Sequence, residues 1–178
     1  MEAPKVPNYT ITRSDPHSDN WVITNSKTFD EYSLALSQKN STLINSKDVK
    51  VCRIKSDGLF TMKKKIIFQT PSARIDAKWS PKLIAYKLKA TTSVKGYEQI
   101  NWKWILNHKN IGLTLKDCNT GEIIASFTHV YRAYEEVGGL EIFKDNLPED
   151  LKLFIASVTA YTFFQVFREV PQVAGWGI

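Results

Sequence analysis

The fold is decided by residues 147–169, which read LPEDLKLFIASVTAYTFFQVFRE. The residues from Leu153 to Phe167 carry no charge, and apolar side chains occur on every face of a helix drawn through them. Fifteen uncharged residues extend about 22 Å as a helix, which is less than the roughly 30 Å hydrocarbon core of a bilayer. We therefore expect a helix that is buried inside protein, with Phe154, Val158 and Phe164 almost wholly buried.

Charges and prolines mark the ends of this helix. Pro148 suits a first turn, and Glu149 and Asp150 follow it at the positive end of the helix dipole. Pro171 is expected to stop the helix, so the predicted helix spans residues 148–169.

The rest of the chain has the pattern of short strands. Ile100, Trp102, Trp104 and Leu106 alternate with other residues, which is the period of two of a half-buried strand. Turn sequences such as Asp57-Gly58 separate such runs. The expected strands are Tyr9–Arg13, Asn20–Thr24, Tyr32–Ser37, Val49–Lys55, Leu59–Thr70, Ala73–Trp79, Ile84–Ala90, Ile100–Asn107, Gly112–Lys116, Glu122–Val130 and Gly139–Phe143.

A closed sheet is the simplest architecture that hides an apolar helix and leaves no sheet edge exposed. We therefore predict a β-rich (α+β) fold, a closed antiparallel β-barrel of about twelve strands around the hydrophobic C-terminal helix. Its 178 residues suit one domain, residues 1–178.

Strand parity separates apolar from basic side chains between Leu59 and Thr70. Lys63 and Lys65 should point away from the core, whereas Lys64 has the parity of the core residues and indicates a bulge, a strand end or a functional position. In the expected strand Ile84–Ala90, Lys87 and Lys89 should face outward, opposite to Ile84, Tyr86, Leu88 and Ala90. The residues expected to face the core in the first strand are Phe60, Met62, Ile66 and Phe68.

Positive charge is concentrated in the middle of the chain. The formal net charge is +6, but residues 47–109 hold 15 Lys or Arg against four Asp or Glu, a net of +11, and the flanks together carry −5. A basic surface attracts phosphate on lipids or nucleic acids through salt-sensitive fields. The alternative is a solvated sheet face that keeps the protein soluble.

No catalytic or metal-binding pattern is present in the sequence. His17, His108 and His129 are scattered, and no nucleophile elbow, phosphate loop or dinucleotide fingerprint occurs. We expect no enzyme activity, no metal and no cofactor. The two cysteines, Cys52 and Cys118, suit reduced thiols, and with no signal peptide evident in the sequence they favour a cytoplasmic protein.

Five local motifs follow one another along the chain, namely Trp102-Lys103-Trp104, Gly112–Asp117, Thr120–Phe127, Gly139–Ile142 and Leu147-Pro148-Glu149. In this order they resemble the tubby C-terminal-like superfamily, which includes LURP-one-related plant proteins and phospholipid scramblases, and in particular its fungal branch. That resemblance implies a barrel threaded by a C-terminal helix, and it implies an anionic-lipid module, because tubby domains bind phosphoinositides through basic side chains outside the barrel. The cysteine-rich lipidation run and calcium motif of scramblases are absent.

Two classes of function remain open. The first is a non-enzymatic module at a cytoplasmic membrane surface that binds phosphoinositides or other anionic lipids, as a monomer. The second is a protein-interaction scaffold, or a lipocalin-like carrier with its helix outside a hollow barrel. Nucleic acid is not expected as a partner, because core packing explains Trp102 and Trp104. The candidate lipid-binding residues are Arg53, Lys55, Lys63, Lys65, Lys87 and Lys89.

Overall fold

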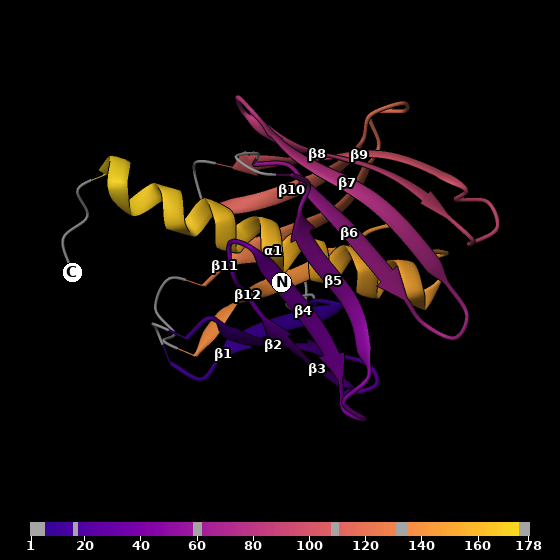
Figure 1. Cartoon of the computed structure of the whole chain (residues 1–178), viewed down its shortest axis with the longest axis horizontal. Helices are drawn as coiled ribbons and strands as arrows, with labels where there is room; N and C mark the ends of the chain where they lie inside the picture. The colour runs from indigo at the N-terminus through magenta and orange to yellow at the C-terminus, as the bar shows by residue number, and fades with distance from the viewer. Residues whose placement is uncertain (1–5, 16–17, 59–61, 108–110, 131–134, 175–178) are drawn as a thin grey trace, which may run out of the picture.

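Twelve antiparallel strands form a closed barrel in which each strand pairs with its neighbours in sequence and β1 pairs with β12 (Figure 1). The computed structural model describes residues 6–15, 18–58, 62–107, 111–130 and 135–174, with side chains as far as residue 166. The elements are β1 (Tyr9–Arg13), β2 (Asn20–Asn25), β3 (Glu31–Ala35), β4 (Asn40–Asn45), β5 (Lys50–Ser56), β6 (Lys64–Gln69), β7 (Arg74–Lys82), β8 (Ala85–Thr92), β9 (Gln99–Asn107), β10 (Gly112–Asp117), β11 (Ile123–His129), β12 (Glu136–Ile142) and α1 (Glu149–Ala174).

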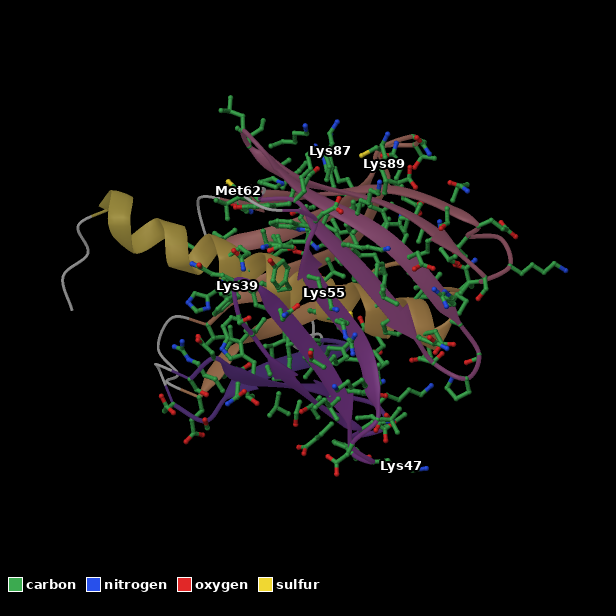
Figure 2. The ribbon with its side chains drawn as sticks, in the orientation of Figure 1. Lys39, Lys47, Lys55, Met62, Lys87 and Lys89 are labelled. Atoms are coloured by element: carbon green, nitrogen blue, oxygen red, sulfur yellow. The ribbon has the colours of Figure 1, made fainter. Side chains whose placement is uncertain are left out.

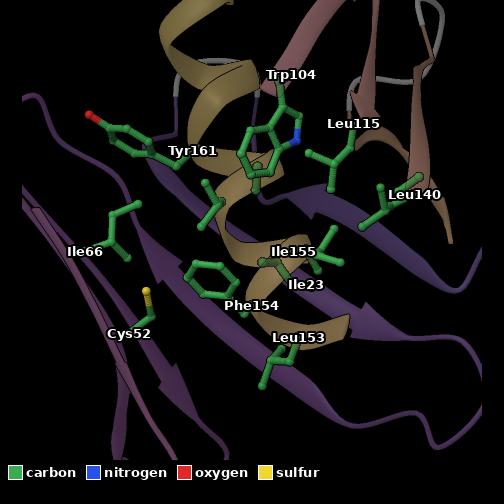
Figure 3. Packing of buried hydrophobic residues seen from close by; sticks show 14 of the residues in the cluster. Ile23, Cys52, Ile66, Trp104, Leu115, Leu140, Leu153, Phe154, Ile155 and Tyr161 are labelled. Carbon is green, nitrogen blue, oxygen red and sulfur yellow. The ribbon is translucent and has the colours of Figure 1, made fainter. Parts of the chain in front are cut away.

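Helix α1 runs through the barrel and fills it with apolar side chains (Figures 1 and 3). Phe154 and Val158 are fully buried and Phe164 is nearly so, as the sequence predicts. A ring of the barrel wall packs on the helix: Phe68 of β6 lies edge-on against Phe154 at 5.6 Å between ring centroids. The predicted fold class is therefore confirmed, and the barrel interior is its hydrophobic core.

Two tryptophan side chains of the wall donate hydrogen bonds to the helix. The indole Nε1–H of Trp104 donates to Thr159 Oγ1 at 2.9 Å, and that of Trp79 donates to Thr162 Oγ1 at 3.1 Å. Thr162 in turn donates to the carbonyl of Val158 at 2.7 Å. Because a buried indole N–H needs an acceptor, the threonines of an otherwise apolar helix have a defined role.

The structure corrects the sequence predictions at the ends of several elements. Strand β4 was not predicted, and α1 continues past Pro171 to Ala174. A proline in a helix loses its N–H bond and crowds the carbonyl four residues earlier, which can kink a helix without ending it. Strand β6 begins at Lys64, so Met62 precedes it and is exposed rather than buried, and Ile84 is exposed because it lies in the β7–β8 turn.

The other residues predicted to face the core are buried or half-buried wherever the structure describes them. Ile66 and Phe68 are buried, as are Leu88 and Ala90, whereas Tyr86 is half-buried. Phe60 lies outside the described residues. In the described part of the chain no helix is both long and apolar enough to cross a bilayer.

Candidate functional site

Four lysines stand at directly paired positions of four adjacent strands. Lys55 of β5 is opposite Lys65 of β6, Lys65 is opposite Lys78 of β7, and Lys78 is opposite Lys89 of β8. All four side chains are exposed on the outside of the barrel. We call these four residues the lysine row. Figure 2 shows Lys55 on the front of the barrel and Lys89 on its upper side, so the row follows the curve of the wall.

This alignment is unfavourable for the isolated fold. Side chains directly opposite each other on antiparallel strands have Cβ atoms about 4.5–5.5 Å apart, and like charges in such pairs are destabilising. In the described part of the chain, no acidic side chain forms an ion pair with any residue of the lysine row. The row therefore presents uncompensated positive charge to solvent.

A second, shorter alignment lies beside the row. Lys87 of β8 pairs with Lys103 of β9, which pairs with Lys116 of β10. Lys87 is two residues from Lys89 on the same strand and shares its outward face. The basic surface thus extends over six adjacent strands, β5 to β10.

The lysine row borders a groove of about 630 Å³ on the outer wall, to which Lys65, Lys78 and Lys89 all contribute. Asn101 and Asn119, joined by a 3.0 Å hydrogen bond, supply further donors and acceptors at its edge. Asp76 is the groove's acidic residue, and Arg74 Nε contacts its Oδ2 at 2.9 Å, which offsets its charge. Ammonium and amide donors around an open groove suit a multiply charged anion.

The predicted candidate residues lie on or near this surface. Lys55, Lys65 and Lys89 belong to the lysine row, and Lys87 lies in the adjacent alignment. Arg53 is two residues before Lys55 on β5 and lines a separate small hollow, whereas Lys63 is exposed in the segment before β6. The surface also contains residues that were not predicted as candidates, namely Lys78, Lys103 and Lys116. The strand register places Lys78 between Lys65 and Lys89.

Lys64 turns inward at the start of β6. Its Nζ donates to the carbonyl of Gln38 at 2.6 Å and to Ser56 Oγ at 3.0 Å. Burial lowers the pKa of Lys64, because desolvation penalises the ammonium form. This lysine is therefore a structural tie between the β3–β4 connection and β6 and lies apart from the outer basic surface.

The side chain of His129 makes its contacts within the protein. Its Nδ1–H donates to the carbonyl of Val137 at 2.6 Å, and its ring lies 5.0 Å from that of Phe163. Burial is the main cause that lowers the pKa of His129, and nearby Arg13 adds to it, while the bond to Val137 opposes the shift. No three His, Cys, Asp or Glu side chains among the described residues are grouped so as to hold a metal ion.

In comparisons with known proteins, no family model, curated protein or solved structure matches the chain.

Proposed function

We propose that this protein is a non-enzymatic module that binds anionic lipid headgroups, phosphoinositides above all, at a cytoplasmic membrane surface. The lysine row carries the proposal, because four like charges in register disfavour the isolated fold and a bound anion would neutralise them. A headgroup with several phosphates can contact neighbouring lysines together. The twelve-stranded barrel with its C-terminal helix is also consistent with membership of the tubby C-terminal-like superfamily, which we propose on the motifs given above.

The alternatives are less well supported. A lipocalin-like carrier needs a hollow barrel, but α1 occupies the interior with buried rings such as Phe154. A protein scaffold that binds an acidic partner would use the same lysines, and it is distinguished by experiment.

The test replaces three lysines of the row with threonine, as Lys65→Thr, Lys78→Thr and Lys89→Thr in one protein. Each lysine near an anionic surface contributes about 1 kcal/mol, so binding to phosphoinositide vesicles should weaken about 100-fold. The matched control is Lys27→Thr, Lys47→Thr and Lys95→Thr, three exposed lysines in turns outside the row. It removes the same net charge and should bind far more tightly than the row variant.

Salt provides a second criterion. Between about 0.1 M and about 1 M salt the Debye length falls from about 10 to about 3 Å, so wild-type binding should weaken strongly. Equal binding by the row and control variants would exclude a specific role of the row. Failure of the wild type to bind phosphoinositide vesicles at low salt would favour the protein scaffold. The row variant should be at least as stable as the wild type, because it loses all three like-charge pairs of the row.

A further inference from the structure

Two apolar side chains in the turn between β7 and β8 are exposed to solvent. Leu83 is fully exposed and Ile84 is 75% exposed, and they form the whole connection between Lys82 and Ala85, which are paired across the hairpin. Two-residue hairpin turns usually contain Gly, Asn or Asp. Leu83 and Ile84 are largely exposed to solvent and give this hairpin an apolar tip.

Further apolar and basic groups surround this turn. Met62, 62% exposed, precedes β6, and Figure 2 places it below the β7–β8 tip at the same end of the barrel. Lys82 is next to Leu83 in the chain, and Lys87 follows Ile84 by three residues. Figure 2 also shows Lys87 and Lys89 projecting from the upper side of the barrel, the side on which the tip stands highest. An apolar tip is thus flanked by ammonium groups.

We propose that the β7–β8 tip inserts into the interface of an anionic bilayer, with Leu83 and Ile84 among the upper acyl chains and Lys82 and Lys87 at the phosphates. This inference rests on the proposed lipid-binding function and adds the orientation of the barrel and a second, apolar source of affinity. A bilayer fits both features at once, because its apolar layer lies directly beneath a plane of negative charge.

The spacing of residues along β8 sets how deeply the tip can enter the bilayer. At about 3.3 Å per residue, Lys87 lies about 10 Å along the strand from Ile84, close to the 5–10 Å by which interfacial apolar groups enter a membrane. Lys89 lies about 17 Å from Ile84, so the hairpin meets the surface obliquely if the lysine row is also to reach headgroups. The outer face of β5 to β8 then faces the bilayer.

The opposite end of the barrel provides a matched control. Phe29, 77% exposed in the β2–β3 turn, is an equally bare apolar side chain and also lies near a lysine, Lys27. In an antiparallel meander the β2–β3 and β7–β8 turns lie at opposite ends of the barrel. Phe29 should therefore remain in water when the β7–β8 tip is inserted.

The experiment compares a tip variant, Leu83→Ser with Ile84→Ser, with Phe29→Ser and the wild type. These changes leave net charge unaltered and touch only exposed side chains, and thermal unfolding confirms the fold of each protein. On vesicles of phosphatidylcholine, phosphatidylserine and a phosphoinositide, the tip variant should bind at least tenfold more weakly, equivalent to about 1.4 kcal/mol. Phe29→Ser should bind as the wild type does.

The insertion depth of the tip is measured with a polarity-sensitive dye attached to the cysteine of Leu83→Cys. This variant also carries Cys118→Ser, so that the dye does not label Cys118. Spin labels on the acyl chains should quench this dye, whereas a dye on Phe29→Cys should be unaffected. An unquenched dye at position 83, or wild-type binding by the tip variant while the lysine-row variant loses binding, overturns insertion and leaves headgroup binding standing. If the wild type binds no vesicles, both proposals fall. A solution dimer that the tip variant dissociates would assign the tip to a protein contact and overturn insertion.

Discussion

Replacing Phe154 with alanine tests whether the helix inside the barrel holds the fold together. Phe154 is fully buried at the centre of the core, and its ring packs edge-on against Phe68 of β6. Truncation of a buried phenylalanine costs about 3–5 kcal/mol, which includes the cavity left behind and the lost ring pair. Since a domain of this size has roughly 5–15 kcal/mol of stability in total, the loss is a large share of it.

Urea unfolding followed by tryptophan fluorescence and circular dichroism measures this loss. With a slope of about 2 kcal/mol per molar urea, the midpoint should fall by about 1.5–2.5 M. Leu83→Ala is the control, because a fully exposed side chain should change stability by no more than about 0.5 kcal/mol.

A loss below about 1 kcal/mol at an unchanged slope would refute the central-helix core. If the alanine variant does not accumulate in soluble form, Phe154→Leu gives the same test with a smaller cavity. It should still be measurably less stable than Leu83→Ala.

Two further predictions concern polar groups inside the barrel. Thr162→Val keeps the shape of the side chain but leaves the Trp79 indole N–H without its acceptor, so stability should fall by about 1–3 kcal/mol, whereas exposed Thr91→Val should be nearly neutral in the same urea assay. The lowered pKa of Lys64 means that the folded state releases this proton more readily than the unfolded chain. The free energy of unfolding of the wild type should therefore rise relative to Lys64→Met as pH increases from about 7 to about 10, and a difference that stays flat or falls would contradict the shift.

The core of this fold can be predicted from sequence because its signals are periodic. The uncharged run from Leu153 to Phe167 can be satisfied only inside protein, and the alternation around Trp102 and Trp104 fixes which strand face meets it. The burial of Trp102, Trp104 and Phe154 follows from these patterns.

The errors occur where a local group replaces the hydrophobic signal. Strand β4 has a serine at a fully buried position, Ser41, whose Oγ donates to the carbonyl of Ser37 and accepts the Ser37 N–H, both at 3.0 Å. A buried polar residue with its own partners hides the alternation. Met62 and Ile84 fail for the opposite reason, since apolar residues at a barrel rim suggest a strand but face solvent.

The lysine row could not be predicted as a unit, because parity gives the face of a residue but not its neighbour on the next strand. Lys55 and Lys65 are opposite one another only because of the register of β5 with β6. A shift of one residue in any of the three pairings would break the row. Register depends on the packing of whole strands against α1, which a single sequence does not display.

The same alternation that builds the core also explains why a binding surface must lie outside it. Inward positions are occupied by side chains packed on α1, so a charge there needs dedicated partners, as Lys64 has in Gln38 and Ser56. Outward positions make no core contacts and can carry any charge that the fold tolerates. Repulsion along the lysine row amounts to about 0.2–1 kcal/mol per pair, which is small beside the several kcal/mol of a single buried phenylalanine. A well-filled barrel can therefore hold four lysines in register without a loss of folding, and the row is available to an anion.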